Sequence, residues 1–170
     1  MIFLLKYYAG IGSRETPRNL IPTINKIVEM LNDKEYILRS GAADGADKFF
    51  EDKADKTEIF LPWEGYNGHT SLLYKDTPEG WKLAEKYHPN WNVLSDGAKK
   101  MMVRNGYQVL GFDLNTPVDF VICWTKNGKM MGGTSQALRI AKDKGIPIFN
   151  LYHENAYKEL YKHLNPFTLF

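Results

Sequence analysis

The sequence has few of the residues that metal or thiol chemistry requires. Its 170 residues include one cysteine and four histidines. Cys123 stands inside the apolar run 120–124, where a buried structural thiol is the expected role, and a lone cysteine forms no disulfide within the chain. The histidines are scattered without the spacing of metal ligands: His69, His88, His153 and His163. We therefore expect no metal site, no cofactor and a reducing, cytoplasmic setting.

Excess charge and long apolar segments are also missing. The formal net charge is +2, so the chain has no global basic field of the kind that drives nonspecific DNA binding. No apolar stretch reaches the length of about 18 residues that a membrane-spanning helix needs. The apolar start, 1–5, stops at Lys6, is too short for a signal peptide, and fits a first β-strand. We expect no membrane partner.

What the chain does have is a regular alternation of apolar runs and helical periodicity. Strands are predicted at 2–9, 35–39, 57–61, 118–124 and 146–151. Helices are predicted from Thr16 to about Leu31, and at about 45–55, 78–87, 96–105, 135–144 and 153–164. Because most of the strands are continuous apolar runs, we expect an α/β, Rossmann-like fold with a mainly parallel sheet covered by helices on both faces. Residues 1–170 are predicted to form one domain, with an insert-like aromatic segment at about 62–105.

Helix boundaries have their own signals. Thr16, Asp44, Thr77 and Ser95 are predicted N-caps, and a proline follows directly after both threonines. Gly145 is expected to end the helix before it.

Small residues follow three of the predicted strands, at 10–14, 40–45 and 132–135. Each stretch leads into a helix, and a parallel fold brings such strand ends together at one edge of the sheet. Free amide groups and helix N-termini at that edge attract anions, phosphate above all. Arg14 is the expected phosphate partner. Arg104, at a predicted helix end, either binds a phosphate or stabilises the negative end of the helix dipole. The expected ligand-binding residues are Gly10, Gly12, Ser13, Arg14, Ser40, Gly41, Ala42, Asp44, Asp47, Arg104, Asn105, Gly132, Gly133, Thr134 and Ser135.

Well-known phosphate and nucleophile motifs are incomplete in this sequence. The first loop is no dinucleotide fingerprint, because Glu15 stands where the third glycine belongs, and it lacks the Gly-Lys-Ser/Thr of a P-loop. There is no nucleophile elbow.

In order along the chain, five short motifs resemble the SLOG superfamily of DprA-type, LOG-type and small YspA-type Rossmann proteins. They are Gly12-Ser13-Arg14, the segment 40–47, Phe60-Leu61-Pro62-Trp63, Arg104-Asn105, and Gly132-Gly133-Thr134 continuing to Ile148. The resemblance covers roughly 5–150 and is closest to the YspA type. It implies a Rossmann-like fold that binds nucleotides, nucleotide-derived signals or single-stranded DNA, and in some members hydrolyses N-glycosidic bonds.

Two departures from the family pattern bear on catalysis. The LOG-type glutamate is replaced by Ala137, and a neutral residue cannot stabilise an oxocarbenium-like centre. The arginine that the family carries in the second loop is replaced by Ala43-Asp44. If the chain is an enzyme, Asp47, Glu64 or Glu15 is the candidate catalytic carboxylate.

Aromatic residues gather in the insert-like segment. Trp63 and Tyr66 follow the third strand, where they either stack on a nucleobase or form a small satellite core.

The sequence favours a module that binds a nucleotide or nucleotide-derived signalling ligand, as a sensor or a sequestering protein. Two alternatives stay open: a nucleoside or nucleotide N-glycosidase, and a DprA-like binder of single-stranded DNA. We expect a homodimer or higher homo-oligomer, in which the end 166–170 is a contact or folds back on its own core.

Overall fold

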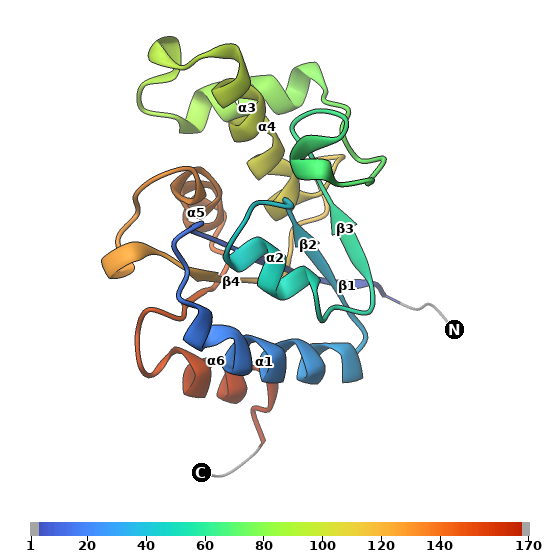
Figure 1. Ribbon diagram of the computed structural model, residues 1–170, viewed down its shortest axis with the longest axis vertical. Helices are drawn as coiled ribbons and strands as arrows, with labels where there is room; N and C mark the ends of the chain where they lie inside the picture. The colour runs from blue at the N-terminus through green and yellow to red at the C-terminus, as the bar shows by residue number, and fades with distance from the viewer. Residues whose placement is uncertain (1–3, 168–170) are drawn as a thin grey trace.

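A five-stranded parallel sheet forms the centre of the computed structural model, which describes residues 4–167 (Figure 1). The strands are β1 (Lys6–Gly12), β2 (Tyr36–Ser40), β3 (Thr57–Ile59), β4 (Phe120–Trp124) and β5 (Ile148–Asn150). Their order is β3-β2-β1-β4-β5, and every neighbouring pair is parallel. The predicted α/β, Rossmann-like fold is confirmed.

Alternate strand residues build two cores, one on each face of the sheet. Tyr8, Phe120 and Ile122 face α1 (Ile21–Asp33), α2 (Ala46–Glu51) and α6 (Ala156–Leu164). Ala9, Val121 and Cys123 face α4 (Asp96–Leu110) and α5 (Thr134–Asp143). The apolar side chains on both faces explain why the strands are continuous apolar runs in the sequence.

A further helix, α3 (Pro78–Tyr87), packs on α4 and α5 rather than on the sheet, at the top of Figure 1. Phe60, Ala84 and Tyr107 form a separate small core there. Four short 3-10 turns complete the chain: η1 (Arg18–Leu20), η2 (Tyr66–Gly68), η3 (Trp91–Val93) and η4 (Lys126–Gly128). Among residues 4–167, no helix combines the length and apolar character needed to cross a bilayer.

The helix signals of the sequence are partly right. Thr77 accepts a hydrogen bond from the Gly80 amide at 3.1 Å, and Ser95 accepts one from the Ala98 amide at 3.2 Å, so both predicted N-caps are confirmed. Gly145, at a φ of 69°, directly follows the last turn of α5 as predicted.

Two predicted N-caps are wrong. Helix α1 begins at Ile21 with Pro22 in its first turn, and the Thr16 hydroxyl instead donates to the Ser13 carbonyl at 2.5 Å. Helix α2 has Gly45 before it, at a φ of 82°, and the Asp44 side chain makes no capping bond. In both cases the loop that leaves the strand continues past the predicted cap, so the helix begins further along the chain, at Ile21 and at Ala46.

Several predicted boundaries shift as well. Helix α4 continues to Leu110 instead of ending near 105, and α2 stops at Glu51. Residues 2–3 of the first predicted strand, and residues 168–170 of the predicted terminal contact, lie outside the described residues. Phe167 is exposed and does not fold back on a core.

Candidate ligand site at the carboxyl edge of the sheet

The three loops with small residues contribute to one cavity of about 390 Å³. Its wall contains residues 11–14 at the end of β1, Ala43 and Asp47 between β2 and the first turn of α2, and 132–134 at the start of α5. Helix α4 supplies much of the remaining wall. The parallel sheet aligns the strand ends, so segments more than a hundred residues apart meet there.

The first loop is held by its backbone. The Ser13 amide donates to the Trp124 carbonyl at 3.0 Å, which extends the pairing of β1 with β4 past the end of the strand. A Cβ on Gly12 would lie 2.7 Å from the Ala46 Cβ and from the Trp124 carbonyl oxygen, so only glycine fits. Arg14 follows with an exposed side chain, and its guanidinium donates to the Tyr66 hydroxyl at 3.3 Å.

Asp47 ties the first loop to the second. Its Oδ1 accepts from the Gly12 amide at 3.1 Å and its Oδ2 from the Ala43 amide at 3.4 Å. Burial raises the pKa of Asp47 to about 6, although Arg104 and the backbone amides favour the charged form. The carboxylate is thus a bridge between loops at the cavity wall.

The segment 40–42 lies behind the cavity. The Ser40 hydroxyl donates to the Gly10 carbonyl at 2.6 Å, and a Cβ on Gly41 would lie 2.1 Å from Gln108 Nε2. Ala42 adopts a φ of 60°. The expectation of backbone left open to a ligand at 40–41 is therefore wrong, since close packing explains these small residues.

Two more predicted binding residues lie away from the cavity wall. Gly10 is required by packing, because a Cβ there would lie 2.5 Å from the Phe50 ring. Asp44 is exposed and accepts a hydrogen bond from Asn67 at 3.1 Å.

Helix α4 contributes a buried polar face to the cavity. Arg104 is only 6% exposed and donates to the Gly41 carbonyl at 2.5 Å. Its guanidinium lies 5.4 Å from the centre of the Tyr66 ring, and burial lowers the pKa of Arg104. Arg104 lies in the middle of α4, so the alternative that it answers the dipole at a helix end is wrong.

Two buried nitrogen atoms on this face have no hydrogen-bond partner among the described residues. They are Arg104 Nε and Gln108 Nε2, and both side chains line the cavity. An unsatisfied buried donor is costly, and protein covers both of these atoms, so they are unpaired polar groups behind the cavity surface. Gln108 was missed from the sequence because the helix was predicted to end before it; its spacing of four from Arg104 is the signal that places both on one face.

The third loop brings the N-terminus of α5 to the cavity. Asn105 donates to the Gly133 carbonyl at 2.8 Å and so fixes the loop to α4. Gly132 and Thr134 line the wall, whereas Ser135 is buried and donates to the Gly132 carbonyl at 2.6 Å. No side chain caps α5, so its first amide groups are left for another acceptor.

The rest of the wall is apolar. Ala98, Met101, Met102 and Met131 supply it, and Met131 is 64% exposed on the loop before α5. This wall was not predicted from the sequence, where its only signal is the two methionine doublets at 101–102 and 130–131.

The predicted stacking aromatics take no part in the cavity wall. Trp63 meets the Tyr66 ring edge-on, with centroids 5.3 Å apart and planes at 85°. Tyr66 is buried in a satellite core with Ala42, Ile59 and Leu61, which favours the second of the two predicted roles.

Of the three candidate carboxylates, Asp47 alone borders the cavity. Glu15 is exposed and lies 3.5 Å from the Lys126 ammonium, and Glu64 is exposed beyond β3. Ala137, at the position of the LOG-type glutamate, is fully buried in the core of the sheet face that carries α4 and α5. Its Cβ points to the sheet rather than to the cavity.

Residues 4–167 contain no group of three or more His, Cys, Asp or Glu side chains arranged to hold a metal ion. The Asp47 carboxylate at the cavity wall already accepts from two backbone amides, and the cationic side chains of the wall, Arg14 and Arg104, suit an anion.

No protein-family model and no curated protein matches the sequence. One solved structure does. The chain has the fold of DNA processing protein A. The match is to the protein from Helicobacter pylori, in a structure described for its single-stranded DNA binding mode, with a TM-score of 0.55 and 19% identity. It covers 86% of this chain and 64% of that chain, so the sequence spans less than two thirds of its neighbour. At this identity the likeness shows a shared fold alone; membership of the SLOG superfamily, and of its YspA type, stays a prediction.

Proposed function

We propose that the cavity between the three loops binds a nucleotide or a nucleotide-derived ligand. The observation that carries the proposal is that two arginines, Arg14 and the buried Arg104, line the same cavity as the N-terminus of α5. A volume of about 390 Å³ is within the range of small-molecule pockets.

In this proposal the phosphate group of the ligand binds to Arg14 and to the first residues of α5. Arg14 is exposed and presents paired donors, and the ten residues of α5 direct the positive end of their dipole to the cavity. The amides of Gly133 and Thr134 are unbonded within the described residues and supply further donors. Together these groups supply the donors for one phosphate group.

The base of the nucleotide packs against the methionine wall, which we define as Met101, Met102 and Met131. Thioether side chains adapt to flat rings and make favourable sulfur–aromatic contacts. This assignment replaces the predicted stacking on Trp63 and Tyr66, because the Tyr66 ring already packs against Arg104.

Isothermal titration with adenosine monophosphate tests the proposal. Arg14→Ala is expected to weaken binding about 10–100-fold, the range for a hydrogen bond to a charged group. Arg18→Ala is the matched control, since it removes the same charge four residues along the chain and outside this cavity. Absence of binding by a panel of nucleoside monophosphates, or equal loss in both variants, would contradict the proposal. Release of free base would show an N-glycosidase instead, with Asp47 as the carboxylate to mutate first.

A second candidate function is single-stranded DNA binding, which rests on the shared fold with DNA processing protein A. Fluorescence anisotropy with a labelled oligothymidylate at two salt concentrations distinguishes it. Salt-dependent binding of the oligonucleotide, without binding of a mononucleotide, would favour DNA.

A further inference from the structure

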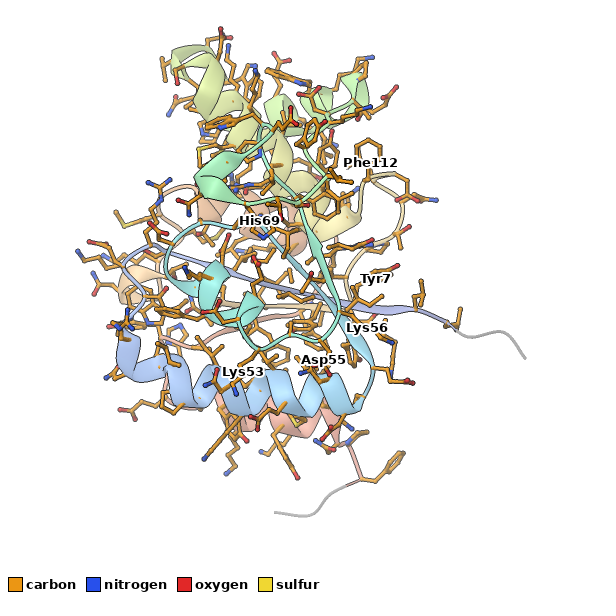
Figure 2. All side chains as sticks on the ribbon, turned by 45° about the vertical axis from the view of Figure 1, so that its right-hand side comes forward. Tyr7, Lys53, Asp55, Lys56, His69 and Phe112 are labelled. Carbon is orange, nitrogen blue, oxygen red and sulfur yellow. The ribbon has the colours of Figure 1, made fainter. Side chains whose placement is uncertain are left out.

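A second cavity lies beside the first, in the groove between α1 and α2. It has a volume of about 630 Å³ and is walled by the start of α1, the η1 turn and one side of α2. Lys53, one of the lining residues, lies between the ribbons of α2 and α1 in Figure 2. Arg14 lines both cavities and is therefore the wall that they share.

Basic side chains dominate this second cavity. Arg14, Arg18, Lys48 and Lys53 line it, against the two carboxylates Asp44 and Asp52. Arg18 and Lys48 are exposed and form no ion pair with a described carboxylate, while Lys53 lies 3.8 Å from Glu29. Asp44 accepts a hydrogen bond from the neutral Asn67 amide and keeps its charge, so four basic side chains stand against two acidic ones. The cavity therefore keeps an excess of unpaired positive charge next to a proposed phosphate site.

We propose that this groove is a second phosphate subsite, so that the ligand of the chain carries two phosphate groups, one on each side of Arg14. The inference rests on the proposed function and deepens it. A nucleotide held with its base on the methionine wall and one phosphate at α5 and Arg14 extends its second phosphate toward Arg18 and Lys48. The chemical class is a dinucleotide or a comparably long bisphosphate.

Titration with a matched pair of ligands tests the subsite. The 5′-phosphorylated dinucleotide pApA is expected to bind at least about tenfold more tightly than adenosine monophosphate, through one or two added charged contacts. The double variant Arg18→Ala/Lys48→Ala is expected to lower the affinity for pApA to that for adenosine monophosphate. Its affinity for adenosine monophosphate is expected to equal that of the wild type. Arg14→Ala is expected to weaken both ligands.

The matched control is Lys142→Ala/Lys144→Ala, which removes two exposed charges at the far end of α5. Equal affinities for pApA and adenosine monophosphate, or equal losses in the two double variants, would overturn the subsite. If neither nucleotide binds, the proposed function itself has failed, which is a separate result.

A second experiment distinguishes a phosphate group of the ligand from a free phosphate ion. Inorganic phosphate is added together with adenosine monophosphate, and broadening of its ³¹P line is measured. One outcome would overturn the two-phosphate ligand: the phosphate signal broadens, the Arg18→Ala/Lys48→Ala variant abolishes the broadening, and pApA binds no more tightly than adenosine monophosphate. The second cavity would then bind a free phosphate ion.

Discussion

At the scale of single residues, Asp47 is the side chain on which the site depends. It is almost fully buried, yet both of its oxygens accept backbone amides, one from each of two loops. An acid in the first turn of a helix is usually a surface residue that complements the dipole. Here the same position serves as a link between strand ends, and this link gives the cavity its shape.

The raised pKa of Asp47 gives stability a defined dependence on pH. The unfolded carboxyl titrates near its ordinary value of 3.8 and the folded one at about 6, so the folded state retains the proton between these values. The contribution of Asp47 to the free energy of unfolding is therefore complete below pH 4 and is lost as the pH rises to about 6. Relative to Asp47→Asn, wild type is expected to lose on the order of 3 kcal/mol across this window.

Urea denaturation of both proteins at several pH values between 4 and 7.5 measures this difference. Asp52→Asn, an exposed acid at the end of the same helix, is the control and should track wild type. A difference between wild type and Asp47→Asn that stays constant with pH would contradict the argument.

A glutamate at position 137, where LOG-type enzymes carry one, would not introduce N-glycosidic bond hydrolysis. Because Ala137 is fully buried against the sheet, Ala137→Glu places an unpaired carboxylate in the core. We expect it to lower the free energy of unfolding by about 3 kcal/mol or more and to release no base from nucleotides. Ala98→Glu is the matched control, since a glutamate three residues after Ser95 completes a capping box and should be neutral or stabilising. Denaturation midpoints that fall equally for both variants would contradict the assignment.

At the scale of elements, the segment 62–77 contacts the second loop through Asn67 and α2 through His69. Asn67 donates to the Ala42 carbonyl at 2.9 Å and to Asp44 at 3.1 Å, and His69 lies 2.8 Å from Glu51. Figure 2 shows His69 where this segment passes above α2. The first of these contacts also holds the back of the second loop, so the segment supports the site without lining it.

Asn67→Asp removes the amide donor at this contact and sets a carboxylate against Asp44. Hydrogen exchange of the amides in 62–74 is expected to accelerate by at least about tenfold, because the lost bonds are worth more than 1 kcal/mol together. Asn127→Asp is a close control, since Asn127 occupies an equivalent left-handed turn, with φ of 58° against 51° for Asn67. Unchanged exchange in 62–74, or equal acceleration in both variants, would show that the contact does not fasten the segment.

At the scale of the whole molecule, the lone cysteine reports on global unfolding. Cys123 lies in β4, which pairs with β1 on one side and β5 on the other, and burial raises the pKa of its thiol to about 12. Opening this strand requires breaking the sheet, so we expect thiol labelling in native buffer at the rate of global unfolding. Gly45→Ala, which places a Cβ 2.4 Å from the Ser13 carbonyl oxygen, should accelerate labelling. Rapid stoichiometric labelling of the wild type would contradict this view.

Comparing sequence with structure shows where local signals suffice. Thr77 and Ser95 begin helices as predicted, because each cap satisfies an amide only three residues away. Thr16 and Asp44 carry the same signal and fail, because each side chain bonds to a group outside the helix, local for Thr16 and distant in sequence for Asp44. Thr16 bonds back to the first loop, and Asp44 is drawn to Asn67.

The sequence by itself determined the parallel α/β fold and the meeting of three loops at one edge, since apolar periodicity and strand order are properties of the chain. The tertiary structure decided which residues of those loops face the cavity. Ser40 and Gly41 were predicted to bind the ligand; instead Gly41 packs against Arg104 and Gln108, and Ser40 donates to the Gly10 carbonyl. Asp47, Gln108 and the methionine wall gained their roles from partners distant in sequence. Local patterns specify where a chain turns, and only packing of the completed fold specifies which side chains are left facing a cavity.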